Sequence, residues 1–487
     1  MSLKKKALSG IFWVVIERFG QQLLQVLIFI ILARLIEPEE FGLSAMLMIF
    51  FAVGQSMVDS GMGQALIREK EITIKDRSTV FWFNLGISLF VYLLIYLGSE
   101  SIAQFYNKQI LDQLSKIMGL SVIFFATAII QRAELTQKLE FKKQAKAQVP
   151  ATIIAGFCSI YLGYEGYGVW ALAAMYVILP LVSSIILWII SPVEIKFVFS
   201  KSSFDRLFGF GYKLFLSGLI DTINQNIYKL VIGKFYNATI LGYYSQSKRL
   251  QQLASLDLVR ILQKVTYPIL AKTNNSQKRL KEGYRKIILL SSIVITPITL
   301  LIIVFSDPII LTFLGSNWGP AALYLQILCV SGMIYHLHSI NLNILKVLGR
   351  SDLFLRLELM KKAIITVAIL IGINFNIHGL LIAQVISSYL NLLINAYYTS
   401  TLLNYSIVEQ LRDYLGVLVL SIPMMSIAIF MSFIGSSDSI LVLLVYLIIA
   451  GLVYFLTLVL VKNESTATIF DLFSDYMPSN FKRFLRI

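Results

Sequence analysis

The sequence is poor in charged residues, cysteine and histidine. Only 14% of its 487 residues are charged and 57% are hydrophobic, whereas an average soluble domain has roughly 25% charged residues. Its two cysteines, Cys158 and Cys329, each lie inside an apolar run. Two small buried thiols do not indicate a disulfide, a metal site or a thiol nucleophile. Because the sequence also lacks a phosphate-binding glycine loop and metal-ligand spacing, we expect no metal, no cofactor and no catalytic residue.

The three histidines do not form a site. His336 and His338 are two positions apart, so on a helix their side chains point about 200° apart and cannot share a ligand. His378 lies in a predicted loop. A proton relay through these side chains is less favoured than simple packing or interfacial hydrogen bonding.

Long apolar runs set the class of the protein. Runs of about 20 residues recur along the whole chain, which is the length needed to cross a hydrocarbon core of about 30 Å. The sequence therefore predicts an all-α, polytopic membrane protein with about fourteen transmembrane helices. The predicted spans are 10–35, 41–66, 80–99, 113–131, 149–164, 168–190, 209–234, 241–271, 287–305, 321–345, 361–376, 377–400, 414–434 and 438–461.

Lysine and arginine are distributed unevenly between the loops. Basic residues concentrate in every second loop and in the two termini, and the loops between hold only one, Lys108. The basic segments contain 31 of the 42 lysines and arginines, and they are 1–9, 67–79, 132–148, 191–208, 272–286, 346–362, 401–413 and 462–487. The positive-inside rule then places both termini in the cytoplasm. The net charge of +15 belongs mostly to a cytoplasmic rim that faces anionic lipid headgroups, so we expect no nucleic acid as a partner.

The chain also shows an internal repeat. Residues 197–241 follow the plan of residues 1–41 at an offset of 200 positions: Gln225 matches Gln25, Lys234 matches Arg34, and Gly242 matches Gly42. Paired halves with polar residues on corresponding helices are typical of transporters. We predict an N-terminal lobe, 1–200, with spans one to six and a second lobe, 201–400, with spans seven to twelve. Residues 401–487 then form two additional spans and a cytoplasmic tail.

Polar residues inside the membrane form stripes on three predicted helices. A charge that faces lipid at the bilayer centre costs roughly 2.5–3.5 kcal/mol, so such residues usually face a bundle interior or a wet cavity. In the first span, Arg18 is followed on one helical face by glutamines. The stripe residues are Arg18, Gln21, Gln22 and Gln25 in the first span, Ser217, Asp221, Asn224, Gln225 and Tyr228 in the seventh, and Ser245, Lys248, Arg249, Gln252 and Ser255 in the eighth, where Asp257, Arg260 and Lys264 follow.

Two interpretations of these stripes compete. They could be interhelical hydrogen bonds and ion pairs that only hold the bundle together, and Asp257 with Arg260, three positions apart, is a candidate pair. We favour a polar cavity, and the excess of basic residues favours an anionic cargo. Asp221 is the candidate site for a coupling ion. The candidate substrate-binding residues are Arg18, Gln21, Gln25, Lys248, Arg249 and Arg260.

Several segments carry a family resemblance. They are Leu66–Lys70 with Asp76–Leu85, Ala133–Ala145, Asp221–Lys234 and Leu314–Ala321. In this order they resemble the Wzx-like oligosaccharide flippases of the bacterial polysaccharide transporter family, especially the colanic-acid and teichuronic-acid export branch. The resemblance covers about residues 1–400. The family belongs to the multidrug/oligosaccharidyl-lipid/polysaccharide exporter superfamily.

The resemblance implies a fold and an activity. The fold would be two six-helix lobes, related as repeats, around a central cavity, with two extra C-terminal helices. The activity would be translocation of undecaprenyl-diphosphate-linked oligosaccharides across the bacterial cytoplasmic (inner) membrane by alternating access, for capsule, exopolysaccharide, O-antigen or teichuronic acid. The implied partners are this polyprenyl-diphosphate-linked oligosaccharide, the lipid bilayer, and a polysaccharide polymerase with other assembly proteins. The family's basic residue in the first span corresponds to Arg18.

Three alternatives remain open at this point. A cation-coupled exporter of small drugs on the same fold would want an acidic lumen, whereas these stripes are basic. A membrane-embedded polysaccharide polymerase or glycosyltransferase needs fixed catalytic groups beside a sugar site, and the longest outward loop, about residues 100–112, is too short to build one. A passive scaffold would leave the intramembrane charge unexplained.

Overall fold

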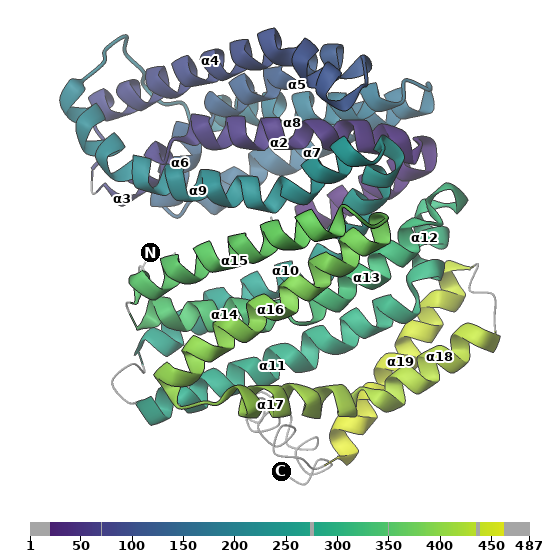
Figure 1. Cartoon of the computed structure of the whole chain (residues 1–487). Coiled ribbons are helices and arrows are strands. Elements are labelled where there is room, and N and C mark those ends of the chain that lie inside the picture. Colours follow the sequence, from purple (N-terminus) through teal and green to yellow (C-terminus); the bar gives the residue numbers. More distant parts are fainter. Residues whose placement is uncertain (1–19, 70, 273–276, 349, 435–438, 462–487) are drawn as a thin grey trace. The chain divides into compact units, whose positions relative to one another are not determined.

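The computed structural model of the protein describes residues 20–69, 71–272, 277–348, 350–434 and 439–461. All regular secondary structure in these ranges is helical (Figure 1). The chain divides into two compact units, Met1–Gly242 and Tyr243–Ile487. An all-helical membrane fold was the expectation from the apolar runs, and it is confirmed.

The first unit contains the helix Gly20–Leu35 and the helices that follow it, coloured purple to teal in Figure 1. These are α2 (Pro38–Asp59), α3 (Met62–Arg68), α4 (Ile74–Tyr106), α5 (Ile110–Ala126), α6 (Ile129–Gln137), α7 (Phe141–Tyr164), α8 (Val169–Ile190) and α9 (Lys201–Phe235). Helix α10 (Ala238–Lys272) begins in this unit and continues in the second one.

The second unit contains the remaining helices. These are α11 (Gln277–Val304), α12 (Ser306–Leu314), the 3₁₀ turn η1 (Ser316–Trp318), α13 (Ala321–Met333), α14 (Tyr335–Val347), α15 (Ser351–Gly372), α16 (Ile377–Leu403), α17 (Ile407–Leu420), α18 (Ile422–Ile434) and α19 (Ile440–Leu460).

Local sequence explains where several helices begin. Thr73 caps α4, because its hydroxyl accepts a hydrogen bond from the Asp76 amide while the Asp76 carboxylate accepts one from the Thr73 amide. Ser406 and Glu409 form the same reciprocal capping box at α17. Such boxes satisfy backbone N–H groups that have no partner inside the helix.

In the first unit, α2 is the central helix. It packs against α4, α5, α8 and α9, and Met46 and Leu47 on it are fully buried. Glycine allows close approach elsewhere in this unit: a Cβ on Gly156 of α7 would lie 2.3 Å from Ile28 Cδ1. The helix Gly20–Leu35 therefore packs closely against α7.

The predicted span 41–66 is broken in the structure. Helix α2 ends at Asp59, and Ser60 and Gly61 have positive φ angles of 45° and 71° before α3 starts. A left-handed backbone is accessible to glycine without steric cost. A Cβ on Gly61 would also lie 2.1 Å from the Gly211 carbonyl oxygen of α9, so the break lets α9 approach the backbone directly.

In the second unit, α11 is the central helix and packs against α13, α14, α16, α17 and α18. The Tyr454 hydroxyl of α19 donates a hydrogen bond of 3.0 Å to the Ile293 carbonyl of α11. The C-terminal helices α17, α18 and α19 thus pack onto the core of this unit, as the buried Val417, Met424 and Ala450 show.

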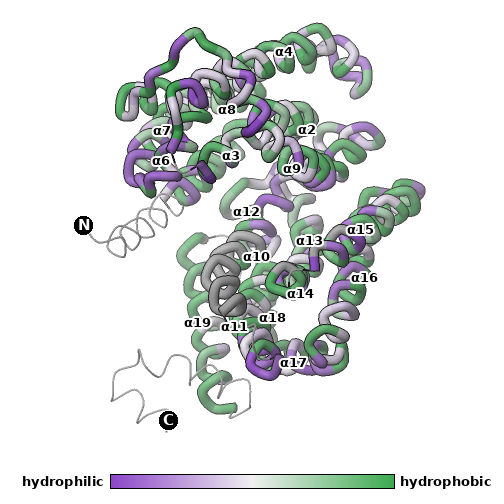
Figure 2. The backbone as a smooth tube through the Cα atoms, turned by 90° about the vertical axis from the view of Figure 1, so that its left-hand side faces the viewer, coloured by the Kyte–Doolittle hydropathy of each residue, from purple (hydrophilic) through white to green (hydrophobic). Residues whose placement is uncertain are grey.

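The described residues include nine helices, up to ten with the bent pair α17 and α18, that are long and apolar enough to span a membrane. Figure 2 shows α19 as hydrophobic along almost its whole length, and Leu441 and Leu452 on it are exposed. The chain is a multi-pass membrane protein. Every predicted span from 41 onward overlaps a helix, but the total of fourteen stays a prediction.

Candidate functional site

The glutamines of the first predicted stripe lie on the helix Gly20–Leu35. Gln21 and Gln25 are half-buried, whereas Leu23 and Leu27 on the opposite side are exposed. Ile28, on the same face as the two glutamines, packs against Gly156 of α7. The glutamine face is therefore the inner side of this helix, and the leucine face is the side suited to lipid. Arg18 lies outside the described residues.

The middle of α9 carries the second stripe and is unusually open. From residue 212 to residue 227 no side chain is buried, although both ends of the helix, at Leu207 and Ile232, are buried in the first unit. Asp221 and Gln225 are exposed within this stretch. In the predicted span 209–234, an exposed carboxylate would require water or a polar surface beside it, which is the environment that a translocation cavity provides.

Another face of α9, beside this stripe, carries hydrogen bonds within the helix. Asn226 donates to the Thr222 carbonyl at 2.9 Å, and the Lys229 ammonium donates to the Asn226 amide oxygen at 3.2 Å. Lys229 is half-buried near the closely packed end of the helix. The Lys229 ammonium, which lies outside the stripe, is therefore held in place by its own helix.

Lys248 and Arg249 lie on α10 within the second unit, and both are half-buried. Gln251 is buried one turn further, where Gly332 of α13 leaves room for its side chain. The α10 backbone includes residue 260, but the side chains of Asp257 and Arg260 lie outside the described residues.

The structure thus assigns the candidate residues to both units. Gln21, Gln25 and Asp221 belong to the first unit, and Lys248 and Arg249 belong to the second. Gln21 and Gln25 share one helix face, and Lys248 and Arg249 are sequence neighbours. Their shared role in one cavity stays a prediction.

The two close histidines have separate partners, as the helical spacing predicts. His336 is fully buried and its Nε2 lies 2.8 Å from the Ser292 hydroxyl of α11. His338 Nδ1 lies 3.3 Å from the Asn395 amide nitrogen of α16. Among the described residues no group of three or more histidine, cysteine, aspartate or glutamate side chains could hold a metal.

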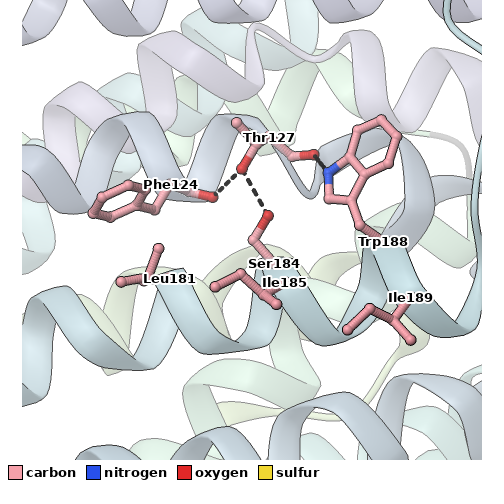
Figure 3. A pocket seen from close by; sticks show the side chains of 7 residues that line it. All are labelled: Phe124, Thr127, Leu181, Ser184, Ile185, Trp188 and Ile189. Atoms are coloured by element: carbon pink, nitrogen blue, oxygen red, sulfur yellow. Dashed lines mark hydrogen bonds between the residues drawn. The ribbon is translucent and has the colours of Figure 1, made fainter.

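A groove of about 380 Å³ lies between the end of α5 and α8 in the first unit (Figure 3). Its hydroxyl groups are satisfied internally: Thr127 donates to the Phe124 carbonyl and bonds Ser184 at 2.7 Å, and Trp188 donates to the Thr127 carbonyl. The groove therefore presents hydrocarbon from residues such as Ile185. It contains none of the predicted cargo-binding residues and does not suit an anionic ligand.

An ion cluster at the start of α4 was not foreseen from the sequence. The Asp76 carboxylate is 1% exposed and accepts a hydrogen bond of 2.5 Å from Arg206 of α9. Arg77 forms an ion pair with the buried Glu134 of α6, which also pairs with Lys138 at 2.9 Å. We call Asp76, Arg77, Glu134 and Arg206 the α4 clamp. It connects α4, α6 and α9 at one end of the first unit.

The segment between α8 and α9 is held beside the α4 clamp. The Lys196 and Ser200 amides donate to the Ser78 and Thr79 hydroxyls, each at 2.9 Å. The Trp82 indole donates to the Lys196 carbonyl at 2.9 Å. Asp76–Leu85 and Ala133–Ala145 are two of the segments that carry the family resemblance. The resemblance marked these residues, but only the fold reveals their partners.

The second unit has a comparable cluster between α11 and α17. Arg285 forms two hydrogen bonds with the Asp413 carboxylate, at 2.6 and 2.9 Å. The Tyr405 hydroxyl donates to the same carboxylate at 2.5 Å. A bidentate pair of this kind combines charge with fixed geometry, and it ties the additional C-terminal helices to α11.

Comparison with known proteins connects this arrangement to a family. The sequence profile of the family described as "Polysaccharide biosynthesis protein" matches residues 31–323. The lipopolysaccharide biosynthesis protein WzxC of Escherichia coli (strain K12) is 26% identical over 382 residues, which cover 76% of each chain. The teichuronic acid biosynthesis protein TuaB of Bacillus subtilis (strain 168) is 27% identical over 357 residues, 72% of this chain and 73% of that protein.

A solved structure has the same fold. The lipid II flippase MurJ, in an inward closed conformation, superimposes with a TM-score of 0.73 over 96% of this chain and 100% of that one, at 17% sequence identity. At this identity the likeness establishes the fold. The all-helical membrane fold that the family resemblance implied is therefore confirmed, and its division into two six-helix lobes stays a prediction.

Proposed function

The chain belongs to the polysaccharide biosynthesis protein family, and on this basis we propose that it is a flippase for lipid-linked oligosaccharides. The cargo would be an oligosaccharide repeat unit on undecaprenyl diphosphate, destined for a surface polysaccharide. The relatives WzxC and TuaB are named for the biosynthesis of such polymers. The observation that carries the proposal is the exposure of two polar side chains, Asp221 and Gln225, in the middle of α9, in a family of this kind.

The charges support an anionic, amphiphilic cargo. A diphosphate that leaves water needs compensating cations, and charge-assisted hydrogen bonds become stronger as the local dielectric constant falls. Arg18, Lys248, Arg249 and Arg260 would supply these cations, and Gln21 and Gln25 would donate to phosphate or sugar oxygens. The lipid tail can remain in the bilayer while the headgroup crosses through the polar cavity.

The alternatives fit less well. We propose a transporter and not an enzyme, because the segments that carry the family resemblance are those of exporters. If the protein were an exporter of cationic drugs, its cargo would be repelled by a cavity lined with the four basic candidates named above. Efflux of a cationic dye that depends on this protein would favour that exporter.

We also propose that the protein lies in the cytoplasmic (inner) membrane of a bacterium with both termini in the cytoplasm, on the basis of the loop charges. Reporter fusions at Ser436 and Glu464 should then report opposite sides of the membrane, because one predicted span, 438–461, separates them. Alkaline phosphatase and green fluorescent protein activities measure this. Both reporters on one side would remove the last hairpin from the proposed topology.

The transport experiment tests cargo and coupling together. Purified protein in proteoliposomes, with a fluorescent polyprenyl-diphosphate oligosaccharide, should expose the sugar to an external glycosidase faster than protein-free vesicles do. We propose that Asp221 binds the coupling ion. Asp221→Asn should therefore lose the acceleration that an imposed proton or sodium gradient produces in the native protein, because the amide carries no negative charge.

The control is Asp205→Asn, which changes an exposed carboxylate near the start of the same helix. It should transport as the native chain does. If an imposed gradient accelerates transport equally in Asp221→Asn and in the native chain, Asp221 does not bind the coupling ion and its role is structural. Absence of any cargo movement in the native chain would reject the flippase proposal itself.

A further inference from the structure

The two glycines that match across the internal repeat face each other's helices. Helix α2 begins at Pro38 and α10 begins at Ala238, two positions that also match at the offset of 200. Gly42 and Gly242 each lie four residues, about one turn, after these starts. All four residues are within the first unit.

The contact is reciprocal and leaves no room for a side chain. A Cβ on Gly42 would lie 1.7 Å from the Ala238 carbonyl oxygen, and a Cβ on Gly242 would lie 2.0 Å from the Pro38 carbonyl oxygen. Both obstacles are backbone atoms, which cannot rotate away as the end of a side chain can. Each helix thus presents its glycine to the first residue of the other helix.

We propose that this crossing of Gly42 and Gly242 is the outer closure of the transport path, which must separate when the cargo is released outward. The inference rests on the proposed flippase function. In the predicted topology the turns at 36–37 and 236–237 face away from the cytoplasm, so the crossing lies on the outer side.

The internal repeat explains why both contact positions hold glycine. Two related helices that meet at matching positions can close symmetrically only if the same small residue occupies both positions. Packing in membranes depends on such small residues, because lipid supplies no hydrophobic force between helices. A methyl group at either position would hold the two helix starts apart and so disfavour the closed state.

A locking experiment tests whether the crossing opens. The two native cysteines are first removed by Cys158→Ala and Cys329→Ala. Cysteines are then introduced at Glu37, which precedes the first residue of α2, and at Thr239, which follows the first residue of α10. A short bifunctional maleimide should link them in membranes, and the linked protein should stop exporting surface polysaccharide. A cleavable linker should restore export after reduction. Normal export by fully linked protein would show that the crossing does not open, and would overturn the proposal.

Glycine variants test the closed state without any cargo. In Gly42→Ala and Gly242→Ala the yield of the 37–239 link should fall about tenfold, which corresponds to about 1.4 kcal/mol of bias against closure. Gly86→Ala is the matched control, because a Cβ at Gly86 of α4 meets no atom within 4 Å; its yield should equal that of the native glycine chain.

The outcomes separate this proposal from the proposed function. Unchanged linking in both crossing variants would overturn the closure, whatever the cargo is. A variant that fails to reach the membrane does not enter this comparison, and the locking experiment on the native glycines then decides. Loss of linking in the crossing variants supports the closure even if the cargo is another amphiphile.

Discussion

Arg18→Ala should abolish surface polysaccharide at normal expression of the protein. Arg18 is predicted to lie near mid-membrane with Gln21 and Gln25 behind it on one helical face, and the structure places these two glutamines on the inner side of their helix. A hydrogen bond to a charged group contributes roughly 1.5–3 kcal/mol, so loss of one diphosphate contact should slow transport by about ten- to a hundredfold. A bidentate contact would raise the loss further.

The charge-conserving variant separates cargo binding from a structural role. Arg18→Lys should retain part of the transport, because it keeps the cation and loses the fork-shaped guanidinium. Glu17→Gln should have a milder effect than Arg18→Ala, since Glu17 is only the neighbouring candidate for an ion pair. Surface polysaccharide is measured at matched protein levels in the membrane. Full polysaccharide with Arg18→Ala would remove Arg18 from the proposed cavity.

Asp76→Ala should give the largest loss of stability outside the cavity. The carboxylate is 1% exposed and accepts hydrogen bonds from the Thr73 amide, the Thr73 hydroxyl and Arg206. Breaking a buried ion pair typically costs about 3–5 kcal/mol. Because the Arg206 side chain is 53% exposed and can return to water, we expect the lower end, about 3 kcal/mol.

Thermal unfolding in detergent and the amount of membrane-inserted protein measure this loss. Asp205→Ala is the control, since that carboxylate is exposed and belongs to the same turn of α9 as Arg206; it should unfold as the native chain does. Arg206→Ala should be milder than Asp76→Ala, because the buried carboxylate keeps its hydrogen bonds from Thr73. A melting temperature for Asp76→Ala equal to that of Asp205→Ala would show that the α4 clamp contributes nothing to the fold.

Much of the fold could be predicted from the sequence because the relevant signals are local. An apolar run of about 20 residues specifies a membrane helix wherever it occurs. The ordered segments that resemble the Wzx-like flippases indicated the family, and the profile match and the shared fold agree. The repeat was visible as matching residues such as Gly42 and Gly242.

The sequence could not reveal contacts between distant segments. Asp76 and Glu134 lie within two family-like segments, but their partners, Arg206 and Arg77, depend on where α9 and α6 pack. The hydropathy pattern predicted one span over 41–66, because hydropathy contains no information about the left-handed turn at Ser60 and Gly61. The polar stripe on α9 was visible, whereas its exposure over residues 212–227 emerged only from the packed structure.

The sequence alone therefore determined the class of the protein, its family, most helix positions and the polar stripes, since hydropathy and helical periodicity act over a few turns. Tertiary structure decided which backbones touch. The match of Gly42 with Gly242 is written in the sequence, but that each one meets the first residue of the other's helix follows from packing two related helices about a common crossing. That crossing joins segments 200 positions apart, and no local preference specifies it.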